Sequence, residues 1–338
     1  MFSLPRELYD WVLDLLDFPS LLAWRGTCRR NQQEVNTILV NTRNRILAYF
    51  IDDVDDFLRM LTWDRAVISG DAALAFFLRD DMVLGIELEV AVPFEEGYDF
   101  EDHLIARFHC TPTHGGSSQK IPQHHPETRR YSLPSGSFLV VAFSHTSSPI
   151  PPVVGRDMTA HINFFSENAF GCGYPALTLR RNSYAHDPSV GLSWICKFDR
   201  ELLQNKCGFR VSSDVCTLVP AGIASLTPQG HLRRHSYPGE CPCIRSHYLC
   251  PGQERFFGDR GSLVGFFDGS TDAIQRMFAE QQAPFGPAAV WRLECYKPCV
   301  SSCDSQNVHL MRNEQHGHLS AMHEPFRYGP RFRGWEWL

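Results

Sequence analysis

Apolar residues recur at helical spacing through the first 62 residues of the chain. Members of the first run are three or four positions apart, which places them in one stripe along a helix. This stripe comprises Leu8, Trp11, Val12, Leu15 and Leu16. A longer helix is predicted by the spacing of Val35, Ile38, Leu39, Thr42 and Ile46. Shorter apolar runs between and after these stripes complete a region that we expect to be helical throughout.

The starts of these helices are marked by residues suited to helix ends. Pro5 falls in the first turn of the first helix, where its missing N–H does no harm. Asp17 has the side chain of an N-cap, and Pro19 follows it just inside the second predicted helix.

The pattern changes near residue 65, where strand signals begin to alternate with helical ones. A short apolar run over 66–68 ends at Ser69 and Gly70, and residues 72–78 have helical spacing. Residues 86–92 alternate between apolar and other side chains, as a half-buried strand does. A strand, a helix and a second strand are therefore predicted in this order.

Further strands are predicted by continuous apolar runs later in the chain. These runs cover 138–143 and 262–267, and 159–165 is a weaker candidate. The segment 111–136 is polar and rich in Pro, His, Gly and Ser, so we expect a loop there. Helices followed by interleaved strands and helices indicate an α+β fold.

These changes of pattern divide the chain into three predicted parts. Residues 1–62 form a helical head, and residues 63–270 form a mixed α/β domain. Residues 271–338 contain a predicted helix over 272–281 and a polar extension that we expect to pack back on the domain. This expectation rests on the aromatic residues of the extension, Phe326, Tyr328, Phe332, Trp335 and Trp337.

Composition narrows the classes of function. The 338 residues are 43% hydrophobic, as in globular proteins, and carry a formal net charge of -6. Because nucleic-acid binding usually needs a basic surface, no nucleic-acid partner is expected. No apolar run approaches the ~20 residues of a membrane helix, so no membrane association is expected either.

The amino end contains charged residues and no signal-like apolar segment, so we expect an intracellular protein, cytoplasmic or nuclear. In a reducing compartment the 12 cysteines should be free thiols or metal ligands rather than disulfides.

Two short segments of the head have a recognisable sequence pattern. The sequence Leu-Pro-Arg-Glu-Leu over 4–8 and the segment 19–30 resemble an F-box. This resemblance implies that the head docks on Skp1 and links the chain to a cullin-type ubiquitin ligase. The contact residues that it implies are Leu4, Pro5, Leu8, Leu13, Leu16, Leu21 and Leu22. The alternative is a helical cap that packs only on its own chain.

The second part is similar to the nucleotidyltransferase fold. Its segment 67–77 contains Ser69-Gly70-Asp71 and leads through Gly85 into the acidic strand 86–92. In that superfamily a strand ends in Gly, a helix follows, and a second strand carries two acids one residue apart. Residues i and i+2 of a strand face the same side, so Glu87 and Glu89 are the candidates for holding a divalent metal. Gly70 is the candidate for approach to a phosphate.

The catalytic set of this resemblance is incomplete. Asp71 places a negative charge where a phosphate would bind. A third carboxylate should come from a later strand, but 138–143 offers none and 159–165 offers only Asn163. An ordinary solvated strand face also explains the two glutamates.

Additional segments point to a set of fungal F-box-linked proteins. Gly258-Asp259-Arg260 resembles a Gly-Asp-Arg segment of these proteins, and Cys241-Pro242-Cys243 lies within a Cys-Pro segment of shifted spacing. The resemblance covers about residues 4–267.

One cluster of soft ligands has the composition of a zinc site. It consists of Cys241, Cys243, His247 and Cys250. Its spacing is not the usual paired Cys-x2-Cys, so buried inert thiols are the alternative. No cofactor is therefore expected.

Together these observations predict an adaptor and not an enzyme. The head would dock on Skp1, and the larger domain would present a recognition surface to an unknown target protein. The alternative is a metal-dependent nucleotidyltransferase that uses Gly70 with Glu87 and Glu89.

Overall fold

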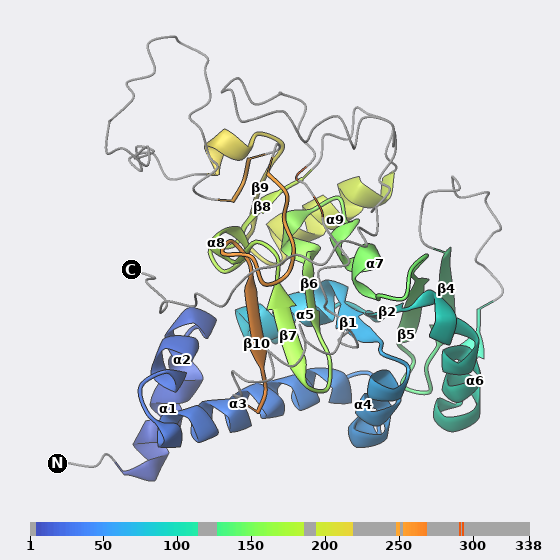
Figure 1. The fold of residues 1–338 in the computed structure, drawn as a ribbon, viewed down its shortest axis with the longest axis horizontal. Coiled ribbons are helices and arrows are strands. Elements are labelled where there is room, and N and C mark those ends of the chain that lie inside the picture. The colour runs from blue at the N-terminus through green and yellow to red at the C-terminus, as the bar shows by residue number, and fades with distance from the viewer. Residues whose placement is uncertain are drawn as a thin grey trace, which may run out of the picture.

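The predicted α+β fold is confirmed, with helices first and a mixed sheet after them (Figure 1). The computed structural model describes residues 5–113, 127–185, 194–218, 248–250, 253–268, 291 and 293. Two predicted features lie mostly or wholly outside these residues. They are the carboxyl-terminal part, 271–338, and the helix expected over 272–281.

The head consists of four helices. They are α1 (Arg6–Leu15), α2 (Phe18–Arg25), α3 (Arg29–Ala48) and α4 (Val54–Trp63). Asp17 caps α2 as predicted, because its carboxylate accepts a hydrogen bond of 2.9 Å from the Ser20 N–H. The long helix α3 contacts α2 and α4, and in Figure 1 it runs beneath the sheet.

The body is built on an eight-stranded sheet with the order β10-β7-β6-β1-β2-β5-β4-β3. Its strands are β1 Val67–Ser69, β2 Glu87–Val92, β3 Thr111–Pro112, β4 Glu127–Ser132, β5 Phe138–Phe143, β6 Asn163–Phe165, β7 Ala169–Cys172 and β10 Leu263–Phe266. Only β2 and β5 run parallel among these pairs. Strands β8 (Asn182–Tyr184) and β9 (Arg210–Ser212) form a separate parallel pair.

The remaining helices connect and cover the strands. They are α5 Gly70–Leu78, α6 Gly97–Phe108, α7 Ile150–Val154, α8 Pro175–Thr178 and α9 Trp194–Asn205, with short 3-10 turns η1 Asp81–Val83, η2 Phe94–Glu96, η3 Thr159–His161 and η5 Val215–Thr217. Helix α5 lies between the sheet and the head, since it contacts β1, β2 and β6 as well as α3.

Head and sheet share one apolar core. Phe18 of α2 packs edge-on against Phe76 of α5 and against Phe170 of β7, with ring centroids 5.4 and 5.6 Å apart. The same cluster continues from Leu13 and Leu21 of the head to Phe267 beyond β10. A domain boundary at residue 62 stays a prediction, but the apolar core is continuous across it.

Arginines of the helices also tie the two parts together. Arg43 of α3 donates to the Glu167 carbonyl and stacks 4.7 Å over the Phe267 ring. Arg79, after α5, donates to the carbonyls of Leu13 (2.9 Å) and Leu16 at the end of α1. These contacts satisfy carbonyls at a helix end that lacks partners within the helix.

Strand β4 was not expected, because 127–132 lies inside the segment predicted as a loop. Its sequence, Glu-Thr-Arg-Arg-Tyr-Ser, has no apolar alternation. In the structure its first four residues are exposed. It is a strand because its backbone pairs with β5 along its whole length. Tertiary pairing therefore overrides a weak local preference.

None of the helices in the described part of the chain has the length and apolar character that a membrane crossing requires.

Candidate functional site

Helix α1 exposes most of its apolar stripe. Four large side chains within two turns of this helix face solvent, with exposed fractions of 47% for Leu8, 70% for Trp11, 41% for Val12 and 85% for Leu15. We call these four residues the outer row. In Figure 1 helix α1 lies at one end of the molecule, away from the sheet.

Two of the predicted contact residues are not at this surface. Leu13 and Leu21 are only 1% and 0% exposed, and both belong to the shared core. Leu16 and Leu22 are half-buried against the same core, Pro5 is exposed, and Leu4 lies outside the described residues. The resemblance placed the interface on the head, but its positions Leu13 and Leu21 serve folding.

Helix α1 is held in a fixed orientation by its inner side. The Tyr9 hydroxyl donates to the Asn31 side chain at 2.9 Å and accepts from the Trp24 indole N–H at 2.9 Å. Arg79 binds the carbonyls at the other end of the helix, as described above. The outer row therefore sits on a rigid support.

In the body, the predicted strand–glycine–helix–acidic strand arrangement is present. Gly70 joins β1 to α5 with φ +65, a conformation that other residues rarely adopt. A Cβ on Gly70 would lie 2.5 Å from the carboxylate carbon of Glu89. Ser69 pairs directly with Glu89 across the two strands. Glycine is therefore required here so that the Glu89 carboxylate can lie over the strand–helix turn.

Each acidic side chain of this region has a basic partner within the protein. Arg156 binds the Glu89 carboxylate, and Arg130 of β4 lies 2.7 Å from the Glu87 carboxylate. Arg130 also stacks over the Phe138 ring, with 3.7 Å to its centroid. Glu87 and Glu89 share a face of β2, as predicted, but separate arginines bind them.

Asp71 has a histidine partner. The Nε2 atom of His161 lies 3.3 Å from its carboxylate. Burial acts to lower the pKa of His161, but the contact with Asp71 and the charges of Asp71 and Glu89 outweigh it and raise that pKa above its ordinary value. Arg156 opposes this rise. We call Asp71, Glu89, Arg156 and His161 the charge cluster.

Strand β5, which pairs with β2, contributes no carboxylate to the charge cluster. In the parallel pairing of β2 with β5, Glu87 is opposite Phe138 and Glu89 is opposite Val140. Directly paired residues point to the same face, so the neighbouring positions on that face are apolar. Asn163 of β6 is fully buried, and its amide donates to the Ala160 carbonyl at 2.6 Å.

The basic partners were missed by sequence reasoning. Arg130, Arg156 and His161 lie 43, 67 and 90 positions from the acids they contact, and each is an ordinary residue in its local sequence. The strand pairing brings Arg130 to β2, and the segment from Arg156 through η3 brings Arg156 and His161 to the acids. No spacing signal in the sequence could have found them.

The candidate zinc cluster is largely untested, because most of its members lie outside the described residues. Cys241, Cys243 and His247 lie outside the described residues, and Cys250 is buried with 2% exposure. Among the residues that the structure does describe, no group of three or more His, Cys, Asp or Glu is placed to hold a metal ion.

The Gly-Asp-Arg segment has a structural role. Asp259 accepts hydrogen bonds from the Gly261 N–H (2.8 Å) and pairs with Arg255 at 2.5 Å. Arg255 is 1% exposed, donates to the carbonyls of Tyr248 and Gly173, and stacks 4.6 Å over the Tyr174 ring. A buried ion pair in which all three guanidinium nitrogens donate hydrogen bonds holds this turn against the end of β7.

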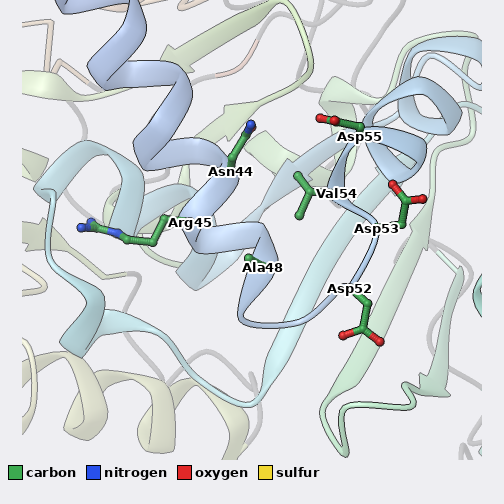
Figure 2. Close-up of a pocket in the computed structure, with 7 residues that line it drawn as sticks. All are labelled: Asn44, Arg45, Ala48, Asp52, Asp53, Val54 and Asp55. Atoms are coloured by element: carbon green, nitrogen blue, oxygen red, sulfur yellow. The ribbon is translucent and has the colours of Figure 1, made fainter.

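Another hollow lies between the end of α3 and the start of α4, and Figure 2 shows residues that line it. Its carboxylates come from Asp52 and Asp53 on the connecting turn and from Asp55 in the first turn of α4. Asp53 caps α4 by accepting from the Asp56 N–H at 2.9 Å. Arg45, on the α3 side, pairs with Asp81 at 3.0 Å. These groups are explained by capping and surface pairing.

Comparisons with known proteins add little. No family model matches the sequence, and no curated protein matches it. Among solved structures the chain is similar to the Thermotoga maritima CCA-adding enzyme complexed with tRNA, at 12% identity and a TM-score of 0.34. The match covers 60% of this chain and 44% of that one, and at this level it carries no argument about function.

Proposed function

We propose that this protein is a non-catalytic adaptor whose helical head docks on a Skp1-like partner while its body presents a recognition surface. The observation that carries the proposal is the outer row of α1. Exposed apolar side chains are common singly, but a contiguous row on one helix marks a partner site. The F-box resemblance supplies the identity of the partner, and its link to a cullin-type ligase is part of the proposal.

The rigid mounting of α1 supports docking. Leu13 and the Arg79 contacts fix the inner side of the helix, so the outer row needs little reordering when a partner covers it. Preorganised side chains lose less entropy on binding and therefore contribute more to affinity. Trp11 is the natural central anchor, because tryptophan is enriched among residues that dominate interfaces.

The charge cluster supports a body without catalysis. A metal-dependent transferase needs carboxylates free to bind a divalent ion. Here Arg156 binds Glu89, Arg130 binds Glu87 and His161 contacts Asp71. The protein's own cations thus neutralise the acids that a metal would use.

A metal-dependent nucleotidyltransferase is the second candidate, favoured by the left-handed Gly70 beside Glu89. Calorimetry with Mg-ATP and Mg-CTP tests it on the full chain. We expect no saturable heat for the unaltered protein. Binding that is abolished by both Glu87→Ala and Glu89→Ala would establish this candidate in place of the adaptor body.

Co-purification with Skp1 tests the head. Trp11→Asp and Leu15→Asp each place a charge in the outer row, and we expect both to abolish the complex. Trp63→Asp is the matched control, because Trp63 is equally exposed (71%) but lies on α4. Circular dichroism should show that all three variants fold.

Two results would overturn the docking surface. One is a complex that survives both outer-row substitutions, and the other is a complex that Trp63→Asp removes equally well. Leu21→Asp is not a useful probe, because Leu21 is buried and its substitution would unfold the head.

A further inference from the structure

A small hollow lies at the carboxyl ends of the parallel strands β2 and β5, far from α1 in sequence. Phe94 follows β2, Ser144 and His145 follow β5, and the first turn of α6 forms the opposite wall. The lining consists of Phe94, Gly97, Tyr98, Glu101, Glu127, Arg129, Phe143, Ser144 and His145. We call this site the aromatic hollow.

Two large rings stand free at the aromatic hollow. Phe94 is 66% exposed and Tyr98 is 78% exposed, whereas Phe143 is 9% exposed within it. A Cβ on Gly97 would lie 3.0 Å from the Phe143 ring, so glycine allows α6 to start close against it. The hollow measures about 80 Å³. Pockets for small-molecule substrates are several times larger, so this one fits the tip of a single side chain.

The surroundings of the aromatic hollow are acidic. The carboxylates on and beside it are Glu95, Glu96, Asp99, Glu101, Asp102 and Glu127. Arg65 pairs with Glu95 and Glu96, and Arg129 pairs with Glu101 and Glu127. Carboxylates outnumber these arginines, and Asp99 and Asp102 are exposed. The surface therefore has an excess of negative charge beside two free aromatic rings.

Within the protein itself, a ring beside a carboxylate binds an arginine side chain. The Arg129 guanidinium lies 5.1 Å from the centroid of Phe143 and pairs with Glu101 at the same time. On the other face of β4, Arg130 combines the Phe138 ring with Glu87 in the same manner. A planar guanidinium stacks on rings and binds carboxylates through its fixed donors. Phe94 and Tyr98 also place aromatic rings beside carboxylates, but these two rings face solvent.

We propose that the aromatic hollow binds an arginine side chain from a basic, extended segment of a partner protein, with Phe94 and Tyr98 contacting the guanidinium and the surrounding carboxylates selecting its charge. The statement that this partner is the adaptor's target rests on the proposed function. The binding itself depends only on the body.

The test uses the 338-residue chain and a defined probe, the peptide acetyl-Gly-Arg-Gly-Arg-Gly-amide. Titration calorimetry should show saturable binding that weakens as salt is added, since charge attraction is screened. The same peptide with citrulline in place of arginine keeps the shape and loses the charge, and it should not bind. Equal binding of the two peptides would overturn the proposal, and so would the absence of any binding of the arginine peptide.

Variants locate the binding. Tyr98→Ala should weaken binding about tenfold, equivalent to ~1.4 kcal/mol, which lies within the range of a cation–π contact. Asp99→Asn with Asp102→Asn should weaken it less and reduce its salt dependence. Tyr49→Ala is the matched control, because Tyr49 is also exposed (55%) but belongs to the end of α3. An equal loss in the control, or none in Tyr98→Ala, would overturn the site.

This experiment separates the inference from the proposed function. Tyr98→Ala should leave Skp1 co-purification intact, and Trp11→Asp should leave peptide binding intact. If Skp1 fails to bind while the peptide results hold, the adaptor role is wrong and the arginine site stands. If only the peptide results fail, the head still docks and the body recognises its target elsewhere.

Discussion

Helices α1 and α2 are neighbours of similar length and similar apolar content, yet their apolar side chains have opposite environments. In α2, Phe18 and Leu21 are at most 1% exposed and pack among the rings of α5 and β7. In α1, the outer row is between 41% and 85% exposed, and only the inner side reaches the core. Apolar spacing thus predicts a helix, but it does not tell which side the protein covers.

The difference separates two uses of apolar surface. Side chains that the chain covers itself contribute to folding, at roughly 25 cal/mol for each Å² removed from water. Side chains left uncovered contribute nothing to folding until a partner removes them from water. We therefore expect substitutions of the buried residues of α2 to change stability, and substitutions in the outer row to change binding.

The largest expected effect comes from Phe18. Phe18→Ala removes a ring that contacts Phe76, Phe77 and Phe170 and leaves a cavity at the centre of the shared core. We expect the free energy of unfolding to fall by about 3–5 kcal/mol. Urea denaturation followed by circular dichroism measures it.

Met82→Ala is the control for Phe18→Ala, because Met82 is 75% exposed and its removal should change stability by less than about 0.5 kcal/mol. If Phe18→Ala proved equally mild, head and sheet would not share a core, and the contrast between α1 and α2 would lose its basis.

Much of the fold could be predicted because its signals are local. Asp17 and Pro19 mark the start of α2, and the alternation over 86–92 marks β2. Strand β4 could not be predicted, because its exposed Arg129 and Arg130 are stabilised by rings and carboxylates of distant segments. Which apolar residues lie in the core and which at the surface also depends on contacts between segments that are distant in the sequence.

For the site, the sequence predicted the acids but not their neutralisation. Gly70, Glu87 and Glu89 follow from a short motif, and β5 lacks a carboxylate as expected. The arginines that bind the glutamates come from other strands and turns, and they change the chemical interpretation of the motif. A carboxylate pair alone suggests a metal site, whereas in this structure each of the two carboxylates is paired with an arginine.

A buried charged group should also affect stability, and His161 allows this to be measured through the pH dependence of unfolding. Its folded-state pKa is raised above the ordinary 6.5, so the imidazolium contributes its stability below that pH and loses it as the pH rises through the folded value. Above about pH 6.5 the free energy of unfolding should therefore fall as the pH rises, with a slope of at most about 1.4 kcal/mol per pH unit from this proton. Urea denaturation at a series of pH values measures the slope.

His161→Gln should flatten that slope, while His109→Gln should leave it unchanged because His109 is exposed at the end of α6. The other ionisable groups near His161 are Asp71, Glu89 and Arg156, with Cys207 close to Asp71. A slope that persists in His161→Gln would assign it to a thiol such as Cys207 and would mean that His161 is not held as a cation.

The smallest expected change in stability comes from Trp11, and it sharpens the comparison most. Trp11 is 70% exposed, so Trp11→Ser deletes a ring that lies mostly in solvent and leaves the core intact. The free energy of unfolding should change by less than about 0.5 kcal/mol, in contrast to the several kcal/mol expected for Phe18→Ala. The same urea experiment, run on both variants, compares one aromatic residue from each helix. A loss of more than about 2 kcal/mol in Trp11→Ser would mean that the chain itself covers the outer row in solution, and the docking surface would then be part of the core.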